Sequence, residues 1–395
     1  MRILFVAMPN SVHSARWIGQ TAGLGWDVHL FPSTPAGALL KLGGPHPDLR
    51  DVTVYGVSFR RHTEVHPSVR LRGLSPLTRL SGLASAVLQP WAPAFLTSLI
   101  RRLKPDIIHS LELQHAGYLT LEAKKKLGAF PPWIVSNWGS DISVFGRLRE
   151  HAERIRELLG ACDYYTCECS RDVELARTFG FHGEALPVWP IAGGIDVGRV
   201  QGFREPGPSS KRRVVALKGY TGWAGRGLVG VRAVELAAAV LRDYRVVTYL
   251  AADDVRLAAG LVTESTGVEF EHLPRSSHDE ILRLHGHART SIGLSIGDGI
   301  STSALEAMAA GSFPIQSHTS CLEEWVRDGE TGLLVHPNDP QEVAAALRRA
   351  VTDDELVDRA AARNLETVQE RLDASRIRPA VVETYERIAA TPRPS

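Results

Sequence analysis

One stretch of the sequence places a single carboxylate near the start of a predicted helix. The segment GDGISTSALEAMAAGSFPIQS, residues 297–317, follows a strand-like run and holds Glu306 among small residues. A helix start offers backbone N–H groups to an anion, and a carboxylate one turn further in can accept two hydroxyl hydrogen bonds. Asp298 stands at the tip of the strand. This arrangement suits a ligand that carries a diol beside a phosphate group.

A purely structural interpretation of Glu306 fits the same residues. Ser303 and Glu306 have the S-x-x-E spacing of a capping box, in which the glutamate returns a hydrogen bond to the N-cap backbone. Gly311 is expected to end the helix, because glycine is frequent just after a helix C-terminus. The residues alone leave the choice between ligand binding and capping open.

A glycine-rich loop is the second candidate site. The strand-like run RVVALKG, 213–219, leads into glycines at 219, 222, 225, 227 and 230, with Lys218 and Arg226 among them. The spacing is not G-x-G-x-x-G and the next strand does not end in the expected acidic residue, which disfavours a nicotinamide cofactor. Two cations and a following helix suit a phosphate, and we favour that interpretation over a flexible loop with solvated charges.

Short apolar runs alternate with helix-length amphipathic stretches along the chain, which predicts parallel sheets covered by helices on both faces. Strands are expected at 2–8, 27–32, 106–111, 133–138, 164–169 and 185–189, and again at 213–219, 245–252, 268–273, 290–296 and 312–317. Helices are expected over 340–351 and onward to about residue 390. The predicted fold class is α/β, with two Rossmann-like doubly wound sheets whose strand-to-helix loops face a cleft.

A segment rich in Gly, Pro and Ser, 190–213, interrupts the periodicity and predicts the boundary between two domains. The chain of 395 residues also exceeds the size of a single hydrophobic core. We expect an N-terminal Rossmann-like domain over 1–192 and a C-terminal Rossmann-like domain over 193–370. Residues 371–395 are expected to form a helix that packs back on the first domain.

Charge and cysteine content argue against several kinds of partner. The net charge of +1 gives no field for collecting nucleic acid, so no nucleic-acid partner is expected. Three of the four cysteines lie in CDYYTCECS, 162–170, whose spacing is not that of a zinc site, and buried free thiols are favoured. The apolar run Ile3 to Met8 is too short for a signal peptide or a membrane span. A soluble, cytoplasmic protein is predicted.

The second half of the chain resembles the nucleotide-binding domain of GT-B glycosyltransferases, specifically the retaining family 4. Asp298 and Glu306 match the family's acidic-x7-acidic motif, and LEAMAAG, 305–311, matches its helix. EEWVRDGETGLLVHPND, 323–339, matches the strand and turn that follow. Two further segments that resemble the family are GGIDVGRV, 193–200, between the domains and KGYTGWAGRG, 218–227, at the basic donor loop.

This resemblance implies a retaining, metal-independent glycosyltransferase that moves a sugar from a nucleotide-diphosphate sugar to a hydroxyl of a glycan, glycolipid or small molecule. It assigns the ribose to Glu306, the donor sugar's hydroxyls to Asp298, and the diphosphate to Lys218 and Arg226. The expected phosphate cradle is completed by the backbone of Gly299, Ile300, Ser301 and Thr302. No cofactor and no metal are expected. The alternatives are a protein that binds the nucleotide sugar without transfer, and an epimerase or hydrolase of nucleotide sugars.

The loops of the N-terminal half depart from the family pattern. The first loop, MPNSVHSARW, 8–17, lacks the usual glycines, and Trp138 stands where the family usually has a histidine before G-x-D. His13 and Asp141 are the candidate catalytic residues, although the family needs no protein base. The residues expected to contact an acceptor are Asn10, His13, His109, Trp138 and Asp141. For each histidine, including His115, a structural role is the commoner alternative.

One arginine-rich segment, 69–106, could rest on an anionic membrane that carries a lipid-linked acceptor. The same segment also fits a core helix with a charged outer face, and we favour that interpretation. The KKK run at 124–126 is equally ambiguous. A peripheral contact with the inner face of the membrane is therefore an open expectation, and the oligomeric state is not predicted.

Overall fold

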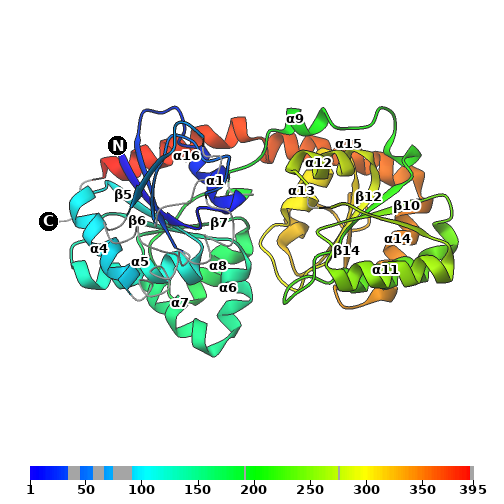
Figure 1. The fold of residues 1–395 in the computed structure, drawn as a ribbon, viewed down its shortest axis with the longest axis horizontal. Helices are drawn as coiled ribbons and strands as arrows, with labels where there is room; N and C mark the ends of the chain where they lie inside the picture. Colours follow the sequence, from blue (N-terminus) through cyan, green and yellow to red (C-terminus); the bar gives the residue numbers. More distant parts are fainter. Residues whose placement is uncertain (34–44, 57–65, 74–90, 191–192, 275, 392–395) are drawn as a thin grey trace. The chain divides into compact units, whose positions relative to one another are not determined.

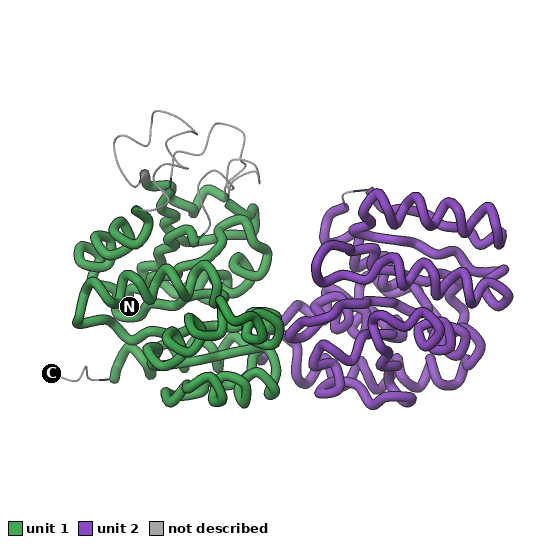
Figure 2. Tube along the Cα trace, turned by 90° about the horizontal axis from the view of Figure 1, so that it is seen from below, with its two compact units in different colours: residues 1–193, 377–395 green, residues 194–376 purple. Residues whose placement is uncertain are grey.

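The computed structural model describes residues 1–33, 45–56, 66–73, 91–190, 193–274 and 276–391. It divides into two compact units (Figure 2): unit 1 is Met1–Gly193 with Ile377–Ser395, and unit 2 is Gly194–Arg376. Each unit contains one parallel sheet with helices on its faces (Figure 1). The predicted α/β class is confirmed.

The described part of unit 1 contains a parallel sheet with the strand order β4-β3-β2-β1-β5-β6-β7-β8. Its strands are β1 (Arg2–Ala7), β2 (Asp27–Pro32), β3 (Thr53–Gly56), β4 (Arg70–Gly73), β5 (Ile107–Leu111), β6 (Trp133–Asn137), β7 (Tyr164–Cys167) and β8 (Glu184–Ala185). From β1 the chain builds outward to β4, then returns to the other side of β1 as β5. The order of the strands therefore reverses between β1 and β5, where open α/β sheets bind ligands.

Alternate residues of β1 point to opposite faces of the sheet, as the period of a strand requires. Ile3, Phe5 and Ala7 pack with α1 (Val12–Gly19) and α16 (Ala374–Ala390). Leu4 and Val6 belong to a second core on the other face. The helices of that face are α4 (Ala92–Leu103), α5 (Tyr118–Leu127), α7 (Arg149–Ala161) and α8 (Ser170–Thr178).

Unit 2 contains a parallel sheet with the strand order β11-β10-β9-β12-β13-β14 among its described residues. The strands are β9 (Val214–Lys218), β10 (Arg245–Tyr249), β11 (Glu269–His272), β12 (Ala288–Gly293), β13 (Phe313–Ser317) and β14 (Leu333–Val335). One face is covered by α10 (Gly227–Ala237), α11 (Asp253–Thr266) and α14 (Pro340–Thr352), and the other by α12 (His278–His287). The strand order reverses between β9 and β12, so the crevice beside their carboxyl ends is the expected ligand position.

Most of the predicted strands are present, and the departures concern short strands at a sheet edge or, for β3, next to one. The strands β3, β4 and β14 were not among the predicted runs, and β8 covers only Glu184–Ala185 of the region around 185–189. The helix interpretation of 69–106 is wrong at its start, because Arg70–Gly73 is a strand; α4 covers 92–103, and 74–90 lies outside the described residues. Edge strands have one unpaired side, so their sequences carry less of the buried, β-branched signal.

The second domain boundary lies at Arg376, beyond the predicted position at 370. The helix α15 (Asp354–Arg371) ends in unit 2, and the chain then pairs with Ile195. The amide of Ile195 donates to the Leu372 carbonyl at 3.0 Å, and the amide of Ala374 donates to the Ile195 carbonyl at 2.8 Å. These two bonds hold residues 372–374 in unit 2.

The C-terminal helix α16 contributes a tyrosine to the core of unit 1. The Tyr385 hydroxyl accepts a hydrogen bond from Trp17 Nε1 at 2.8 Å and lies 2.6 Å from His109 Nδ1. Ile377, Val381 and Ile388 are buried in the same core. From Ile377 onward, the C-terminal helix therefore belongs to unit 1, which also contains the N-terminus of the chain.

We expect Tyr385→Phe to lower the free energy of unfolding by about 2 kcal/mol, because two buried polar groups lose their partner. Urea unfolding followed by tryptophan fluorescence measures the change. The exposed Tyr220→Phe is the matched control, with a change below about 0.5 kcal/mol expected. Equal effects of the two variants would show that the Tyr385 hydroxyl contributes nothing to the packing of α16.

Two of the lysines that suggested a membrane contact, Lys124 and Lys125, make contacts within unit 1. Lys124 Nζ donates to the Ala161 carbonyl at 2.6 Å. Lys125 Nζ lies 3.1 Å from Glu122 Oε1 and 2.7 Å from Glu157 Oε1. No helix among the described residues has the length and apolar character needed to span a bilayer.

Candidate functional site

Lys218 ends β9, the strand at which the order of unit 2 reverses. Its Nζ donates to Ser303 Oγ, 3.5 Å away in the first turn of α13 (Thr302–Ala309). Ser303 Oγ lies 3.1 Å from Ser301 Oγ. The end of β9 and the start of α13 therefore place an ammonium group beside two hydroxyls.

The start of α13 has backbone amides close to Lys218. Ser301 is the N-cap with an extended backbone, and its side chain makes no capping hydrogen bond. Within the described part of the chain, no acceptor is recorded for the amides of Ile300, Ser301, Thr302 and Ser303. Gly299 donates its amide to Asp298 Oδ1 at 2.9 Å, so this member of the predicted cradle serves the turn instead.

The capping-box interpretation of Ser303 and Glu306 is wrong. Ser303 lies inside the helix, because the N-cap is Ser301. Gly311 ends the helix as predicted, with φ of +77° and its amide 3.1 Å from the Met308 carbonyl. The amide of Ser312 reaches the Ala307 carbonyl at 2.8 Å, which completes the hydrogen bonds of a Schellman motif. The Glu306 side chain takes no part in these C-terminal hydrogen bonds, although its carbonyl accepts the Ala310 amide at 2.9 Å.

Glu306 is a buried carboxylate that contacts a histidine from another helix. Only 3% of the residue is exposed. Its Oε1 lies 2.7 Å from Nε2 of His278, the first residue of α12, whose side chain is 41% exposed. Burying a carboxylate is costly unless it is hydrogen-bonded or paired, so the His278 contact offsets part of that cost. Sequence analysis missed His278, which lies on a different helix from Glu306.

Two further buried side chains surround Glu306. Burial raises the pKa of Tyr249, which hydrogen-bonds Ser303. Burial lowers the pKa of His285 to about 4, so this imidazole is neutral at physiological pH. His285 Nδ1 lies 2.9 Å from Ser291 Oγ, whereas its Nε2 has no hydrogen-bond partner in the described structure. Both side chains are close enough to Glu306 to feel its charge, and the neutral His285 adds no positive charge there.

Arg226 stabilises its own loop through hydrogen bonds. Its Nε donates to Asn338 Oδ1 at 2.7 Å, and its Nη1 donates to the carbonyls of Trp223, Ala224 and Gly225 at 3.3, 3.4 and 2.9 Å. The loop also pairs with the segment after β12, through the Gly225–Ser295 bridge. The guanidinium predicted to bind the diphosphate is therefore hydrogen-bonded to its own loop and to Asn338 in this conformation.

The glycines of this loop are explained by close packing. A Cβ on Gly225 would lie 2.2 Å from the Tyr220 carbonyl oxygen, and one on Gly219 would lie 2.7 Å from Ala251 Cα. The amides of Gly219 and Gly227 donate to protein carbonyls at 2.8 and 3.0 Å. The loop glycines thus let the chain fold back on itself, and of the loop's two cations Lys218 is the one beside the start of α13.

The predicted acceptor residues of unit 1 come from three strand ends. Asn10 follows β1 and has a buried Oδ1 with no recorded partner in the described residues. His13, on α1, lies with its ring 5.4 Å from the ring of Trp138, which follows β6. Asn10 and His13 therefore stand at the β1 side of the switch point of unit 1, and Trp138 stands beyond β5.

Asp141 is buried at the end of β6 and accepts backbone hydrogen bonds. Its Oδ2 accepts from the amides of Leu113 at 3.1 Å and Trp138 at 3.2 Å. Burial and the charge of the nearby Glu112 carboxylate raise the pKa of Asp141. The carboxylate therefore holds the loops after β5 and β6 together, and only 7% of the residue is exposed.

His109 has a structural role, and its assignment as an acceptor contact is not retained. It is 1% exposed and lies on β5. Both ring nitrogens have protein partners, with Nδ1 2.6 Å from the Tyr385 hydroxyl and Nε2 2.8 Å from Ser136 Oγ. Burial lowers its pKa to about 3, so it stays neutral.

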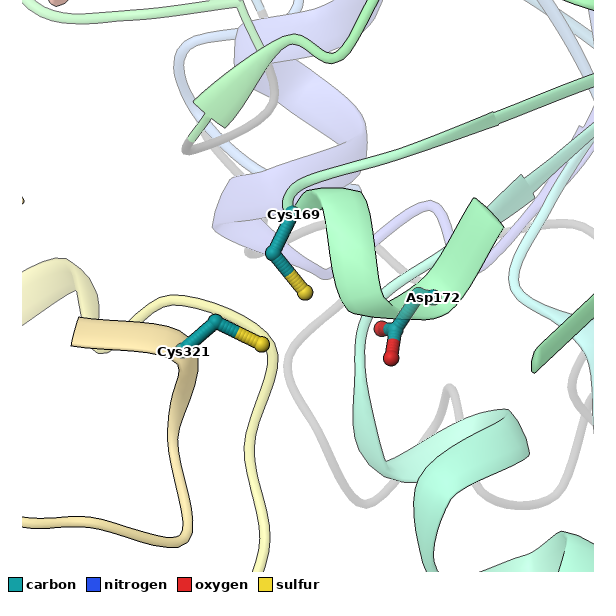
Figure 3. Close-up of side chains that lie close together, drawn as sticks. All are labelled: Cys169, Asp172 and Cys321. Atoms are coloured by element: carbon teal, nitrogen blue, oxygen red, sulfur yellow. The ribbon is translucent and has the colours of Figure 1, made fainter. Parts of the chain in front are cut away.

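All four cysteines are free and buried. Figure 3 shows Cys169 and Asp172 at the start of α8 and Cys321 of the segment after β13. Asp172 accepts hydrogen bonds from Asn137 Nδ2 at 2.7 Å and Arg171 Nε at 2.8 Å. Cys321 belongs to unit 2 and the other two residues to unit 1, so neither unit by itself supplies three ligands from this group.

Comparison with known proteins gives two family matches. The family described as glycosyl transferases group 1 matches residues 263–366, and the family described as glycosyl transferase 4-like matches residues 91–161. A D-inositol 3-phosphate glycosyltransferase of Nocardioides sp. is 37% identical over 101 residues, which is 26% of this chain and 22% of that relative's length. Both matched families lie where the resemblance placed a donor and an acceptor domain.

Solved structures decide the fold. The sucrose-phosphate synthase of Thermosynechococcus elongatus superposes with a TM-score of 0.72 at 17% identity, covering 99% of each chain. The chain has the GT-B fold, and two of its segments match glycosyltransferase families. Anabaena HepE in complex with UDP-glucose matches with a TM-score of 0.64 at 16% identity, over 98% of this chain and 100% of that one. The E. coli trehalose-6-phosphate protein bound with UDP-2-fluoro glucose matches with a TM-score of 0.69 at 14% identity, over 99% and 100%.

Proposed function

We propose that this protein transfers a sugar from a nucleotide-diphosphate sugar to an acceptor hydroxyl, with retention of the anomeric configuration and without a metal ion or other cofactor. The observation that carries the proposal is the convergence of Lys218, the amides of 300–303 and the buried Glu306 at the switch point of unit 2. The families matched by sequence, and the nucleotide sugars named for the GT-B neighbours HepE and the E. coli protein, support it.

Each group in the crevice suits one part of such a donor. The Lys218 ammonium and the amides of 300–303 bind the diphosphate and stabilise the charge that develops on it as the sugar leaves. Glu306 accepts the two ribose hydroxyls, and His278 shares or releases the carboxylate when the ribose binds. Asp298, in the loop between β12 and α13, contacts the sugar. Arg226 holds the adjoining loop in place.

The acceptor side is proposed to lie on unit 1, with Asn10, His13, Trp138 and Asp141 near it. The acceptor is a hydroxyl of a glycan, a glycolipid or a small molecule. We also propose that the protein is cytoplasmic, contacts the membrane peripherally and has no nucleic-acid partner.

A thermal-shift screen of common nucleotide sugars tests the donor. A ligand at about 100 times its Kd should raise the melting temperature by roughly 5–10 °C, because it stabilises by about 2.7 kcal/mol. EDTA should leave both the shift and the transfer unchanged. NMR of the product should show the anomeric configuration of the donor.

Three results would contradict the proposal in different places. If no nucleotide sugar shifts the transition, the donor assignment is wrong. A product with the inverted anomeric configuration would contradict the retaining mechanism. Loss of activity with EDTA would contradict the proposal that no metal ion is needed. Binding that leads to free or epimerised sugar in the presence of acceptors would favour the hydrolase or epimerase alternative.

A further inference from the structure

The residue after β5 has a backbone conformation that side chains rarely adopt. Glu112 has φ of 86° and ψ of 156°, a region occupied almost only by glycine. It leads directly into a π-helical turn, η3 (Leu113–Gly117), in which the Gly117 amide donates to the Glu112 carbonyl at 3.0 Å. Strained residues and π-turns both concentrate at functional sites, and strain of about 1–3 kcal/mol needs compensation.

The strained backbone places the Glu112 carboxylate over the start of its own turn. The carboxylate accepts hydrogen bonds from the amides of His115, at 2.9 and 3.1 Å, and Ala116, at 2.5 Å. Its Oε2 also lies 3.3 Å from His115 Nδ1. One buried carboxylate thus fixes both the turn and the ring of a histidine.

The two side chains differ sharply in exposure. The Glu112 side chain is 5% exposed, whereas the His115 side chain is 58% exposed. With Nδ1–H directed to the carboxylate, the neutral imidazole carries its lone pair on Nε2, the atom on the far side of the ring. The structure records no protein partner for Nε2 among the described residues. This is the arrangement of an orienting carboxylate, a histidine and an open acceptor atom.

The pair lies at the switch point of unit 1. The sequence places Glu112 immediately after β5, the strand beside β1, while Asn10 and His13 follow β1 and Trp138 follows β6. Ligands of open α/β sheets bind beside the carboxyl ends of such strands. The position therefore matches that of a substrate contact on the acceptor unit.

We propose that His115 Nε2 accepts the hydrogen bond of the acceptor's sugar hydroxyl, and that Glu112 is the positioning residue that holds this imidazole. The proposal rests on the proposed function and adds to it a residue that contacts the acceptor, with a glycoside as the acceptor class to be tested. It also supplies an acceptor-side histidine to a chain that has Trp138 where the family usually places one. No covalent step is assigned to His115.

The charges near His115 agree with this orientation. The hydrogen bond to Glu112 raises the pKa of His115 against the opposing effect of partial burial. The Glu112 and Asp141 charges act in the same direction as that hydrogen bond. His115 therefore becomes able to accept a hydroxyl hydrogen bond only after it loses this proton, at a pH above the ordinary histidine value.

Nitrogen-15 NMR of the histidine rings tests the orientation and the binding separately. In the full-length protein at a pH where the ring is neutral, His115 should be the Nδ1–H tautomer, and Glu112→Gln should convert it to a mixture. Titration with methyl glucopyranosides, mannopyranosides and galactopyranosides, with and without bound nucleotide sugar, should shift the Nε2 signal of His115 for at least one glycoside. An unchanged tautomer in Glu112→Gln, or an unmoved Nε2 signal with every glycoside, would overturn the proposal.

Kinetics with the glycoside that binds provide a second readout. His115→Gln should raise the acceptor KM about 10-fold, equivalent to about 1.4 kcal/mol, and leave the KM of the nucleotide sugar within about 2-fold. His182→Ala, an exposed histidine of unit 1 after α8, is the matched control and should change neither constant. Equal changes in both constants would reject an acceptor-specific role. A different result would show that the proposed function is wrong: no nucleotide sugar binds, while the NMR signals of His115 still shift when a glycoside is added.

Discussion

Replacing Lys218 with alanine is expected to weaken the binding of a nucleoside diphosphate by about 100-fold. Its ammonium reaches Ser303 Oγ at the start of α13, beside amides that have no acceptor among the described residues. A charge-assisted hydrogen bond to phosphate contributes about 1.5–3 kcal/mol, and Arg226 is held by its own loop and Asn338. Isothermal titration calorimetry with UDP, GDP and ADP measures the loss for whichever diphosphate binds the unchanged protein.

A second lysine provides the comparison. Lys211 is also in unit 2, has a side chain that is 71% exposed, and lies 3.9 Å from Asp354. Lys211→Ala should leave the affinity within about 2-fold, because a surface charge outside the crevice is screened by solvent. If Lys218→Ala and Lys211→Ala bind the diphosphate equally well, the phosphate position assigned to the end of β9 is wrong.

Glu306→Ala is the variant with the second largest expected effect, a loss of about 100-fold in nucleotide-sugar affinity. A carboxylate that accepts two ribose hydroxyls gives up two charge-assisted hydrogen bonds when it is removed. The corresponding 2′,3′-dideoxyribose nucleotide should bind the variant and the unchanged protein with nearly the same affinity, because both contacts are already missing. Calorimetry on the four combinations of protein and ligand isolates the ribose contact.

A carboxylate that only caps a helix is the control for Glu306, because its removal should lower stability without affecting ligand binding. Asp353 caps α15 by accepting the Leu356 amide at 2.9 Å, in the same unit. Asp353→Ala should cost about 1 kcal/mol of stability and leave the affinity unchanged. The assignment of Glu306 would be contradicted if its variant resembled Asp353→Ala, with a lower melting temperature and normal binding.

The contact between His278 and Glu306 affects how the ribose can bind. Its Nε2 lies 2.7 Å from Glu306 Oε1, so a ribose hydroxyl must share this oxygen or displace the imidazole. The contact connects the first residue of α12 to the second turn of α13.

Local sequence signals predicted the parts of the site that a single segment determines. The small residues around Glu306 correctly indicated a helix start after a strand and an end at Gly311. Buried β-branched runs such as Val214–Lys218 and Ala288–Gly293 likewise lie in the centre of the sheet. These features depend on residues within about one helical length of each other, where periodicity and capping rules apply.

Contacts between distant segments could not be predicted from the sequence. The S-x-x-E spacing occurs at Ser277–Glu280 and at Ser303–Glu306, but only the first is a capping box. Glu306 pairs instead with His278, because the fold brings α12 beside α13. His109 was mistaken for an acceptor contact because its partner Tyr385 lies near the other end of the chain. The strain at Glu112 is a backbone property with no sequence signature.

Hydrogen exchange at the start of α13 tests the central claim that a nucleotide sugar binds at the β9–β12 switch point. The amides of 300–303 have no acceptor in the described structure, so they should exchange rapidly in the free protein. With the nucleotide sugar that gives the largest thermal shift, mass spectrometry should show slower exchange in peptides covering 299–304, and no slowing in Lys218→Ala at the same ligand concentration. Protection that appears elsewhere in the chain while 299–304 exchange unchanged would contradict the account.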